Sequence, residues 1–358
     1  MMFRTFIPTR LASQIFDLAL WALAGLHLLL LLSFLLILGA LNPAGAAQDD
    51  ACRGTDLLAA MRAEDPAGYA RLQAEAAEIE NGNSIFWKIE KPGLAASYLL
   101  GTMHVTDPRV LAMPDGAKAA AAAARVIIVE SDEILDENKA MAKLLAKPQL
   151  TMMTDGRTIE HYLTPQEKSD LEAGLKARGI PLAAVSRMQP WMLSSFLALS
   201  ACELARKTGG ADFLDKQIAE DAAQAGRQVQ GLETMEEQLE AIASIPTDFH
   251  VKSLLEMVRL GDRMTDVTTT MTDLYLKGEI GMMMPMLKVV APDSAEGEGY
   301  AQFEERVVTD RNHRMAERAL PLLAEGGAFI AVGALHLTGD QGLVTLLRKA
   351  GYTLTPDP

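Results

Sequence analysis

The chain has 358 residues, of which 49% are hydrophobic and only 5% aromatic, so it is not a disordered protein and can bury a sizeable core. Its 47 acidic residues outnumber its 33 lysines and arginines, which gives a formal net charge of -14 at pH 7. Because such a surface repels polyanions, nucleic acid is not expected as a partner.

The first 47 residues differ in composition from the rest. Two arginines precede an apolar stretch from about residue 18 to residue 41, and small residues follow at 43–47. This order is typical of an export signal with a signal peptidase site, although the stretch is also long enough to span a bilayer. We therefore predict that residues 1–47 are a cleaved signal peptide or a retained membrane anchor that tethers the chain through residues 18–41. Either alternative places the remainder outside the cytoplasm, in the periplasm or extracellular space.

The sequence contains two cysteines, Cys52 and Cys202. In an exported chain an even pair of cysteines favours one disulfide, which would attach the N-terminal segment to the body of the domain. Two buried free thiols are the alternative.

In chain order, hydrophobic periodicity predicts a helix over 57–79 and then a β-hairpin built from runs at 85–89 and 97–103. An alanine-rich helix over 115–124 leads into a β-branched strand at 125–130. Apolar residues spaced three and four apart then predict a long helical block, with helices over 136–146, 164–178, 191–207 and 211–225.

The pattern returns to strand character at 228–233, and a helix begins at Met235. Helical spacing continues from 247 to 325, interrupted by a loop at 292–297. The pattern then predicts a strand at 329–336, a helix at 343–349 and a final strand at 352–354.

Strands therefore cluster towards the two ends of the chain. The simplest fold is α/β, of the mixed α+β type, with one sheet built from N- and C-terminal strands and a large inserted helical block. We expect residues 48–358 to form a single domain, with the helical insertion at about 136–227 and 235–325. The oligomeric state is left open.

The same short pattern occurs at two strand ends: Gly101-Thr102-Met103-His104 and Gly333-Ala334-Leu335-His336 each follow an apolar run. In α/β sheets this edge presents ligand-binding side chains, so the two histidines are expected to converge on one pocket. Paired imidazoles suit a metal site or acid-base chemistry near neutral pH. Glu130 and Glu233 end two further strand runs and are additional candidates.

These segments resemble the TraB/GumN family. The resemblance rests on residues 97–109 (SYLLGTMHVTDPR), Glu130, 231–238, Arg311-Asn312 and 333–342 (GALHLTGDQG), in the expected order. The family includes exported bacterial proteins, pheromone-shutdown proteins and the animal Tiki proteins, which resemble metal-dependent proteases. The resemblance implies a metallohydrolase-like site in the bacterial cell envelope, without naming a substrate.

Carried over to this sequence, the family motifs fall on His104, Glu130 and His336, with Arg311 at the position of a family arginine. Two neutral imidazoles and a carboxylate can hold Mn²⁺, Co²⁺ or Zn²⁺ and leave a position open for water. Arg311 would hold a carboxylate or a developing oxyanion. Glu233 is expected to be a further ligand or a general base. The alternative is that it has no functional role and only precedes a helix whose N-terminus is capped by its neighbour Thr234.

Three hypotheses remain. The first is a metal-dependent hydrolase, most directly a peptidase, acting on a peptide or another small envelope substrate through His104, Glu130, His336, Arg311 and Glu233. The second is a non-catalytic envelope protein that binds or sequesters a peptide or saccharide in the same pocket. The third is a structural envelope protein in which the histidines only stabilise strand ends. A hydrolase without a metal would use the same residues, one histidine as base and the other as electrostatic stabiliser. Three further histidines, His161, His250 and His313, are expected at the surface.

Overall fold

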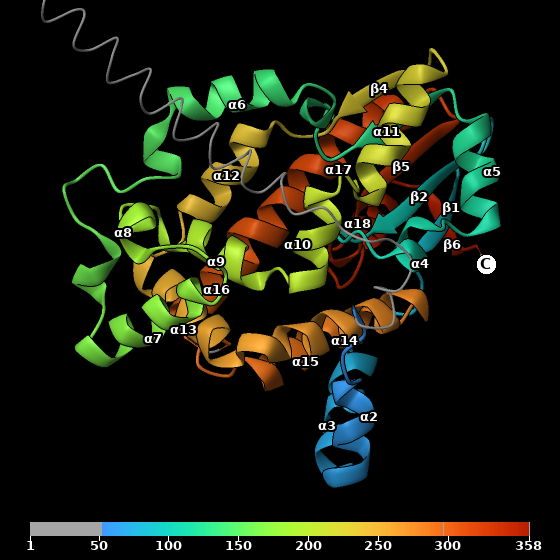
Figure 1. Cartoon of the computed structure of the whole chain (residues 1–358). Coiled ribbons are helices and arrows are strands. Elements are labelled where there is room, and N and C mark those ends of the chain that lie inside the picture. Colours follow the sequence, from blue (N-terminus) through green and yellow to red (C-terminus); the bar gives the residue numbers. More distant parts are fainter. Residues whose placement is uncertain (1–51, 296, 358) are drawn as a thin grey trace, which may run out of the picture.

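The computed structural model describes residues 52–295 and 297–357, which form one sheet covered by helices and a separate group of helices (Figure 1). The predicted signal or anchor segment and its boundary at residue 47 lie outside the described residues. In the part of the chain that the structure describes, no helix is long and apolar enough to cross a membrane.

The sheet has six strands in the order β4-β3-β5-β2-β1-β6, with parallel pairing from β4 to β2 and antiparallel pairing of β1 with both neighbours. This confirms the predicted hairpin and the single mixed sheet that joins strands from both ends of the chain. The strands are β1 (Phe86–Glu90), β2 (Ser97–Thr102), β3 (Val126–Val129), β4 (Gln228–Gly231), β5 (Ala328–Gly333) and β6 (Thr353–Pro356).

Both faces of the central strands β2, β3 and β5 are buried, as their unbroken apolar runs predict, whereas the edge strands β4 and β6 are partly exposed. In β3, Val126 and Ile128 face one hydrophobic cluster, whereas Ile127 and Val129 face the other, because successive side chains of a strand alternate. The first cluster is covered by α14 (Met264–Leu276), α15 (Met283–Val290), α17 (Asp310–Leu323) and α18 (Leu343–Lys349). The second is covered by α5 (Asp115–Ala123) and α11 (Leu214–Gln224).

A third hydrophobic cluster lies away from the sheet, on the left of Figure 1. Leucines that are fully buried on neighbouring helices, such as Leu171, Leu193 and Leu254, form its centre. The cluster holds together α7 (Pro165–Lys176), α8 (Leu182–Val185), α9 (Pro190–Ala198) and α13 (Thr247–Leu260). The remaining helices include α4 (Pro108–Leu111), α6 (Glu137–Ala146), α12 (Met235–Ala243), α16 (Glu298–Phe303) and the π-helical η7 (Glu304–Thr309).

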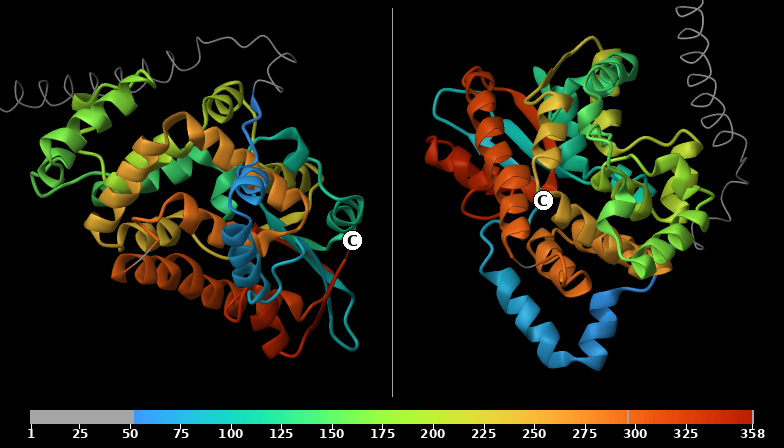
Figure 2. Two further views of the ribbon diagram at one scale, coloured as in Figure 1. Left: turned by 90° about the horizontal axis from the view of Figure 1, so that it is seen from below. Right: turned by 90° about the vertical axis from the view of Figure 1, so that its left-hand side faces the viewer.

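Two predicted helices are each divided in the structure. The expected helix over 57–79 is wrong as a single element, because it breaks into α2 (Leu57–Glu64) and α3 (Pro66–Ala77), a hairpin that projects from the body (Figure 2). Proline disfavours helical backbone at the residue before it, and Asp65 instead caps α3. Similarly, the expected helix over 191–207 divides into α9 and α10 (Ala201–Thr208), where Ser200 caps the second helix.

The predicted disulfide is confirmed. Cys52 and Cys202 are bonded, with their Cα atoms 5.4 Å apart and 150 positions between them in sequence. The bond attaches the beginning of the described chain to α10.

Candidate functional site

The candidate residues follow the carboxyl ends of neighbouring parallel strands. Thr102 at the end of β2 pairs with Gly333 at the end of β5, and Val129 of β3 pairs with Ala331 of β5. The residues that follow each of these strands therefore lie at the same edge of the sheet. A cavity of about 280 Å³ at this edge is lined by His104, Glu130, Arg311 and His336, together with backbone and apolar side chains.

The glycine of the first motif allows the two motifs to approach each other. A Cβ added at Gly101 would lie 3.0 Å from the Cα of Ala334 in the second motif, a contact against backbone that cannot move aside easily. The hydroxyl of Tyr275, on α14, donates a 2.9 Å hydrogen bond to the carbonyl of Gly101. Close backbone packing thus fixes the distance between the two strand ends.

Glu130 is buried and accepts hydrogen bonds on both carboxylate oxygens. The backbone N–H of Gly333 donates to Oε1 at 2.7 Å, while Arg311 and Gln238 donate to Oε2 at 2.7 and 3.1 Å. Burial alone would raise the pKa of Glu130, but His336, His104 and Arg311 outweigh it and lower that pKa to about 2. The side chain is therefore a carboxylate at neutral pH.

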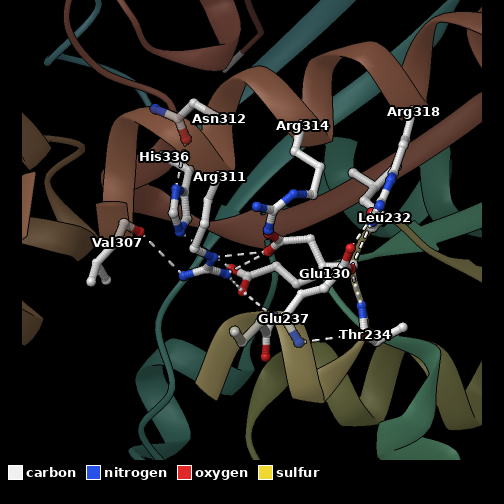
Figure 3. Close-up of polar contacts among 12 residues, drawn as sticks. Glu130, Leu232, Thr234, Glu237, Val307, Arg311, Asn312, Arg314, Arg318 and His336 are labelled. Atoms are coloured by element: carbon white, nitrogen blue, oxygen red, sulfur yellow. Dashed lines mark hydrogen bonds and ion pairs between the residues drawn. The ribbon is translucent and has the colours of Figure 1, made fainter. Parts of the chain in front are cut away.

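Arg311 links Glu130 to Glu233. Figure 3 shows Arg311 beside Glu130. Its Nε donates to Oε2 of Glu233 at 2.9 Å, and its Nη2 lies 2.8 Å from the same oxygen. The other oxygen of Glu233 accepts from Arg314 at 3.0 Å. Burial raises the pKa of Glu233, although Arg311 opposes this effect. Arg311 thus holds carboxylates of the protein itself.

Glu233 does not line the cavity; its side chain is fully buried behind Arg311. The structure therefore gives it the role of fixing the arginine. Its neighbour Thr234 does cap α12, in a capping box with Glu237, as the alternative interpretation of this segment predicted.

His336 is buried and held in one orientation. Its Nδ1 lies 2.6 Å from Oδ1 of Asn312, whose amide nitrogen donates to the carbonyl of Gln341 at 2.9 Å. That second bond fixes the orientation of the amide, so Nδ1 of the ring carries the proton and Nε2 carries the lone pair. Burial lowers the pKa of His336 to about 4, although Glu130 acts in the opposite direction. The imidazole is neutral at pH 7, and its Nε2 lies 3.9 Å from Oε1 of Glu130.

His104 differs from His336, because its side chain is 56% exposed and its Nε2 lies 3.6 Å from Oδ2 of Asp215. Partial burial lowers the pKa of His104, but the Asp215 carboxylate outweighs this effect and raises that pKa to about 9. The ring also packs against Phe213, with a centroid separation of 5.0 Å. At neutral pH the two histidines therefore differ in charge.

Asp215 is a site residue that the sequence analysis missed. It is 3% exposed, and its Oδ1 accepts a 2.7 Å hydrogen bond from Thr102. Its Oδ2 has no hydrogen-bond partner and faces His104. The sequence did contain a signal, because Asp215 occupies the apolar face of α11 at helical spacing from Ile218 and Ala222. An acid at a buried position needs a partner, and His104 is the group that faces it.

The donor types at this edge fit a divalent transition metal, since an imidazole with a fixed tautomer and an ionised carboxylate are among its usual ligands. However, among residues 52–295 and 297–357 no three His, Cys, Asp or Glu side chains are positioned together as a ready group of ligands. The side chains of His104, Glu130 and His336 thus share a cavity without forming a closed ligand set.

His161, His250 and His313 do not line this cavity. His161 and His313 are exposed, as expected. The expectation for His250 was wrong, because it is only 7% exposed and its Nε2 lies 3.0 Å from the carbonyl of Ile242. Helical position within α13, next to Val251 and Leu254, buries it.

Comparisons with known proteins show which chains this one is similar to. The chain is 24% identical over 76% of its length to the metalloprotease TIKI homolog of Nematostella vectensis, of which it covers 67%. It is 25% and 23% identical, over 77% of its length in each case, to metalloprotease TIKI1 of Danio rerio and of Homo sapiens, covering 63% and 62% of those proteins. The chain thus spans about two thirds of the length of these relatives. No solved structure matches it.

A family model described as the TraB/PrgY/gumN family matches residues 85–356. The match begins just before β1 and ends in β6, so it contains the whole sheet and each of the candidate residues. On this evidence the chain belongs to the TraB/PrgY/gumN family.

Proposed function

We propose that this protein is a metal-dependent hydrolase that cleaves an amide or ester bond, most directly a peptide bond, in the cavity between β2, β3 and β5. One observation carries the proposal: two imidazoles and a buried carboxylate follow adjacent parallel strands and line one cavity. The similarity to metalloproteases of the TIKI type supports the reaction class.

Each residue has a distinct role in this proposal. His336 offers the lone pair of Nε2, and Asn312 prevents the ring from rotating. Glu130 contributes an ionised oxygen, while Arg311 keeps that carboxylate charged and oriented. His104, which follows β2, completes the set and would lose its proton when it binds the ion. A divalent ion held by His104, Glu130 and His336, such as Mn²⁺, Co²⁺ or Zn²⁺, would supply Lewis-acid polarisation of the substrate carbonyl.

We further propose that the protein works outside the cytoplasm, in the cell envelope. The Cys52–Cys202 disulfide supports this compartment, because such bonds persist in oxidising surroundings. Cleavage of the N-terminal segment, or its retention as a membrane tether through residues 18–41, belongs to the same proposal.

The first test measures metal content and metal affinity of the purified protein and of the variants His104→Ala and His336→Ala. His313→Ala is the matched control, because His313 is exposed and bonds only to Gln341. Circular dichroism verifies that each variant remains folded. We expect stoichiometric binding of Mn²⁺, Co²⁺ or Zn²⁺ in the wild type and control, and its loss in both site variants.

Hydrolysis of a peptide library is then measured with each ion and with chelator. Activity that needs the ion and both histidines is the expected result. Wild-type protein that binds none of the ions would overturn the metal-dependent mechanism. Activity that persists in chelator would indicate a metal-free hydrolase, whereas ligand binding without turnover would indicate the alternative, a peptide- or saccharide-binding protein.

A further inference from the structure

A second cavity, of about 460 Å³, adjoins the candidate site. We call it the apolar cleft; it lies between α9, α13, α14, α15, α16 and η7, and Arg311, Leu335 and His336 line both it and the first cavity. Figure 1 shows α9, α13 and α16 at the left of the molecule and α14 and α15 along its lower side. A ligand in the apolar cleft therefore reaches His336 without leaving the protein.

The lining of the apolar cleft is dominated by large hydrophobic side chains, among them Trp191, Phe249, Leu260, Met284, Leu287 and Phe303. Its volume is within the roughly 300–1,000 Å³ of sites for small organic ligands. Because the lining is so largely hydrophobic, affinity should increase with the apolar surface that a ligand buries along its length.

Most polar side chains that line the apolar cleft already have partners within the protein, including His250, Lys288 and Tyr300. The hydroxyls of Ser194 and Ser195 donate back to the carbonyls of Pro190 and Trp191, both at 3.1 Å. The carboxylate of Glu256, on α13, accepts hydrogen bonds from the backbone N–H groups of Asp293 and Ser294, in the loop after α15. Few hydrogen-bonding groups therefore remain for a ligand inside the cleft.

The walls are helical, so their backbone N–H and C=O groups are largely bonded within each helix. No strand of the described sheet contributes a residue to the lining, and an extended peptide would find no strand edge to pair with. Peptide backbone buried there would leave donors and acceptors unpaired, which is unfavourable. A linear hydrocarbon has no such groups.

We propose that the apolar cleft binds the linear alkyl or acyl chain of an amphiphilic substrate, whose polar, hydrolysable head lies beside His336. The assignment of the head group rests on the function proposed above, whereas binding of the chain does not. The substrate class is thus an acylated peptide or related acyl compound.

The test uses the fluorescence of Trp191, which lines the cleft. Full-length protein is titrated, in chelator, with dodecanoate that carries a terminal bromine atom, a quencher that acts over short range. All proteins in this test carry Trp21→Phe, so that Trp87, which is buried in the sheet, is the other tryptophan present. Saturable quenching that is lost when Trp191→Phe is added is expected. Absence of saturable quenching would overturn the proposal.

Two variants fill the cleft from different walls: Ser253→Phe on α13 and Ala291→Phe after α15, both at half-buried lining positions. Ser169→Phe, on the exposed face of α7, is the matched control. Once circular dichroism has shown the variants to be folded, we expect the affinity for the probe to fall by about tenfold or more in the two cleft variants and to stay unchanged in the control. Equal affinity in all three variants would contradict the assignment.

A competition experiment distinguishes an acyl chain from the side chains of an apolar peptide as the group that the cleft binds. A short peptide carrying a dodecanoyl group is expected to displace the probe at lower concentration than the same peptide without it. Equal displacement by an unacylated apolar peptide would assign the cleft to peptide side chains and overturn the proposal. Because these measurements are made in chelator and need no turnover, failure of the metal or of hydrolysis leaves their result unaffected.

Discussion

Arg311 is the residue whose removal most directly tests the electrostatics of the site. It is buried and bonds to Glu130 and Glu233, which are themselves 10% and 0% exposed. The substitution Arg311→Met keeps most of the side-chain volume but removes the charge. Two carboxylates would then remain in the interior without their shared cation.

Breaking a buried ion pair by removing one partner typically lowers the free energy of unfolding by about 3–5 kcal/mol. Here part of the stabilisation remains, because Gly333 and Gln238 still donate to Glu130 and Arg314 still contacts Glu233. We therefore expect a loss of about 3 kcal/mol at pH 7.

The loss should depend on pH with a definite sign. In the wild type the pKa of Glu130 is lowered to about 2, so its contribution is present above pH 4.5, the usual pKa, and disappears as pH falls towards 2. Without Arg311 the pKa values of Glu130 and Glu233 rise, and protonation relieves the uncompensated charge. The difference between wild type and variant should therefore be smaller at pH 5 than at pH 7.

Urea unfolding in chelator, followed by circular dichroism at both pH values, measures this difference. Arg259→Met is the matched control, because the Arg259–Asp293 pair is about 60% exposed on both sides and should contribute less than about 1 kcal/mol. A loss at Arg311 no larger than that of the control, or one independent of pH, would refute the argument. If Arg311→Met does not fold, adding Glu130→Gln should restore folding.

Three further substitutions have defined outcomes. Arg318, together with the backbone of Thr234, outweighs partial burial and lowers the pKa of Glu237 to about 2. Glu237→Gln should therefore lower the free energy of unfolding by about 1–2 kcal/mol at pH 7. Urea titrations should show that this difference between wild type and variant vanishes as pH falls from 4.5 towards 2. Cys52→Ser opens a loop of about 150 residues and should lower the free energy of unfolding by about 4–5 kcal/mol. The thermal melt of the variant should match that of wild-type protein in reductant, and a melt that coincides with that of oxidised wild-type protein would contradict this prediction. Gly101→Ala places a Cβ 3.0 Å from backbone and should cost about 1–3 kcal/mol in denaturant unfolding. The control Gly174→Ala, at ordinary contact distance within α7, should be neutral or stabilising, and equal effects at both glycines would argue against close packing of the motifs.

Local patterns were sufficient for the sheet. The runs that end at His104, Glu130 and His336 contain strands in the structure, because unbroken apolar and β-branched residues suit positions buried on both faces. The run that ends at Glu233 contains β4, a more exposed strand at the edge of the sheet. Parallel strands must end at a common edge, so the convergence of the two motifs followed from the same pattern. Helix boundaries were less accurate at Asp65-Pro66 and Ser200, where capping residues end one helix and begin the next.

The pairing of charges was decided only by the tertiary structure. Arg311 reaches Glu130 across 181 positions of sequence, and Glu233 is placed behind it rather than in the cavity. The sequence suggested that Arg311 would bind a carboxylate or an oxyanion, but the carboxylates are those of Glu130 and Glu233. Such contacts depend on how helices pack on the sheet, which local periodicity does not encode.

The fold class, the strand-end positions of the two histidines and the segments that identify the family could be predicted from the sequence alone, since these features depend on residues close together in the chain. Only long-range packing makes His336 buried and neutral, leaves His104 exposed beside Asp215, and forms an apolar cleft that leads to His336. Two motifs of the same Gly-x-x-His pattern acquired different environments, because burial and neighbouring charge come from distant helices and not from the motif.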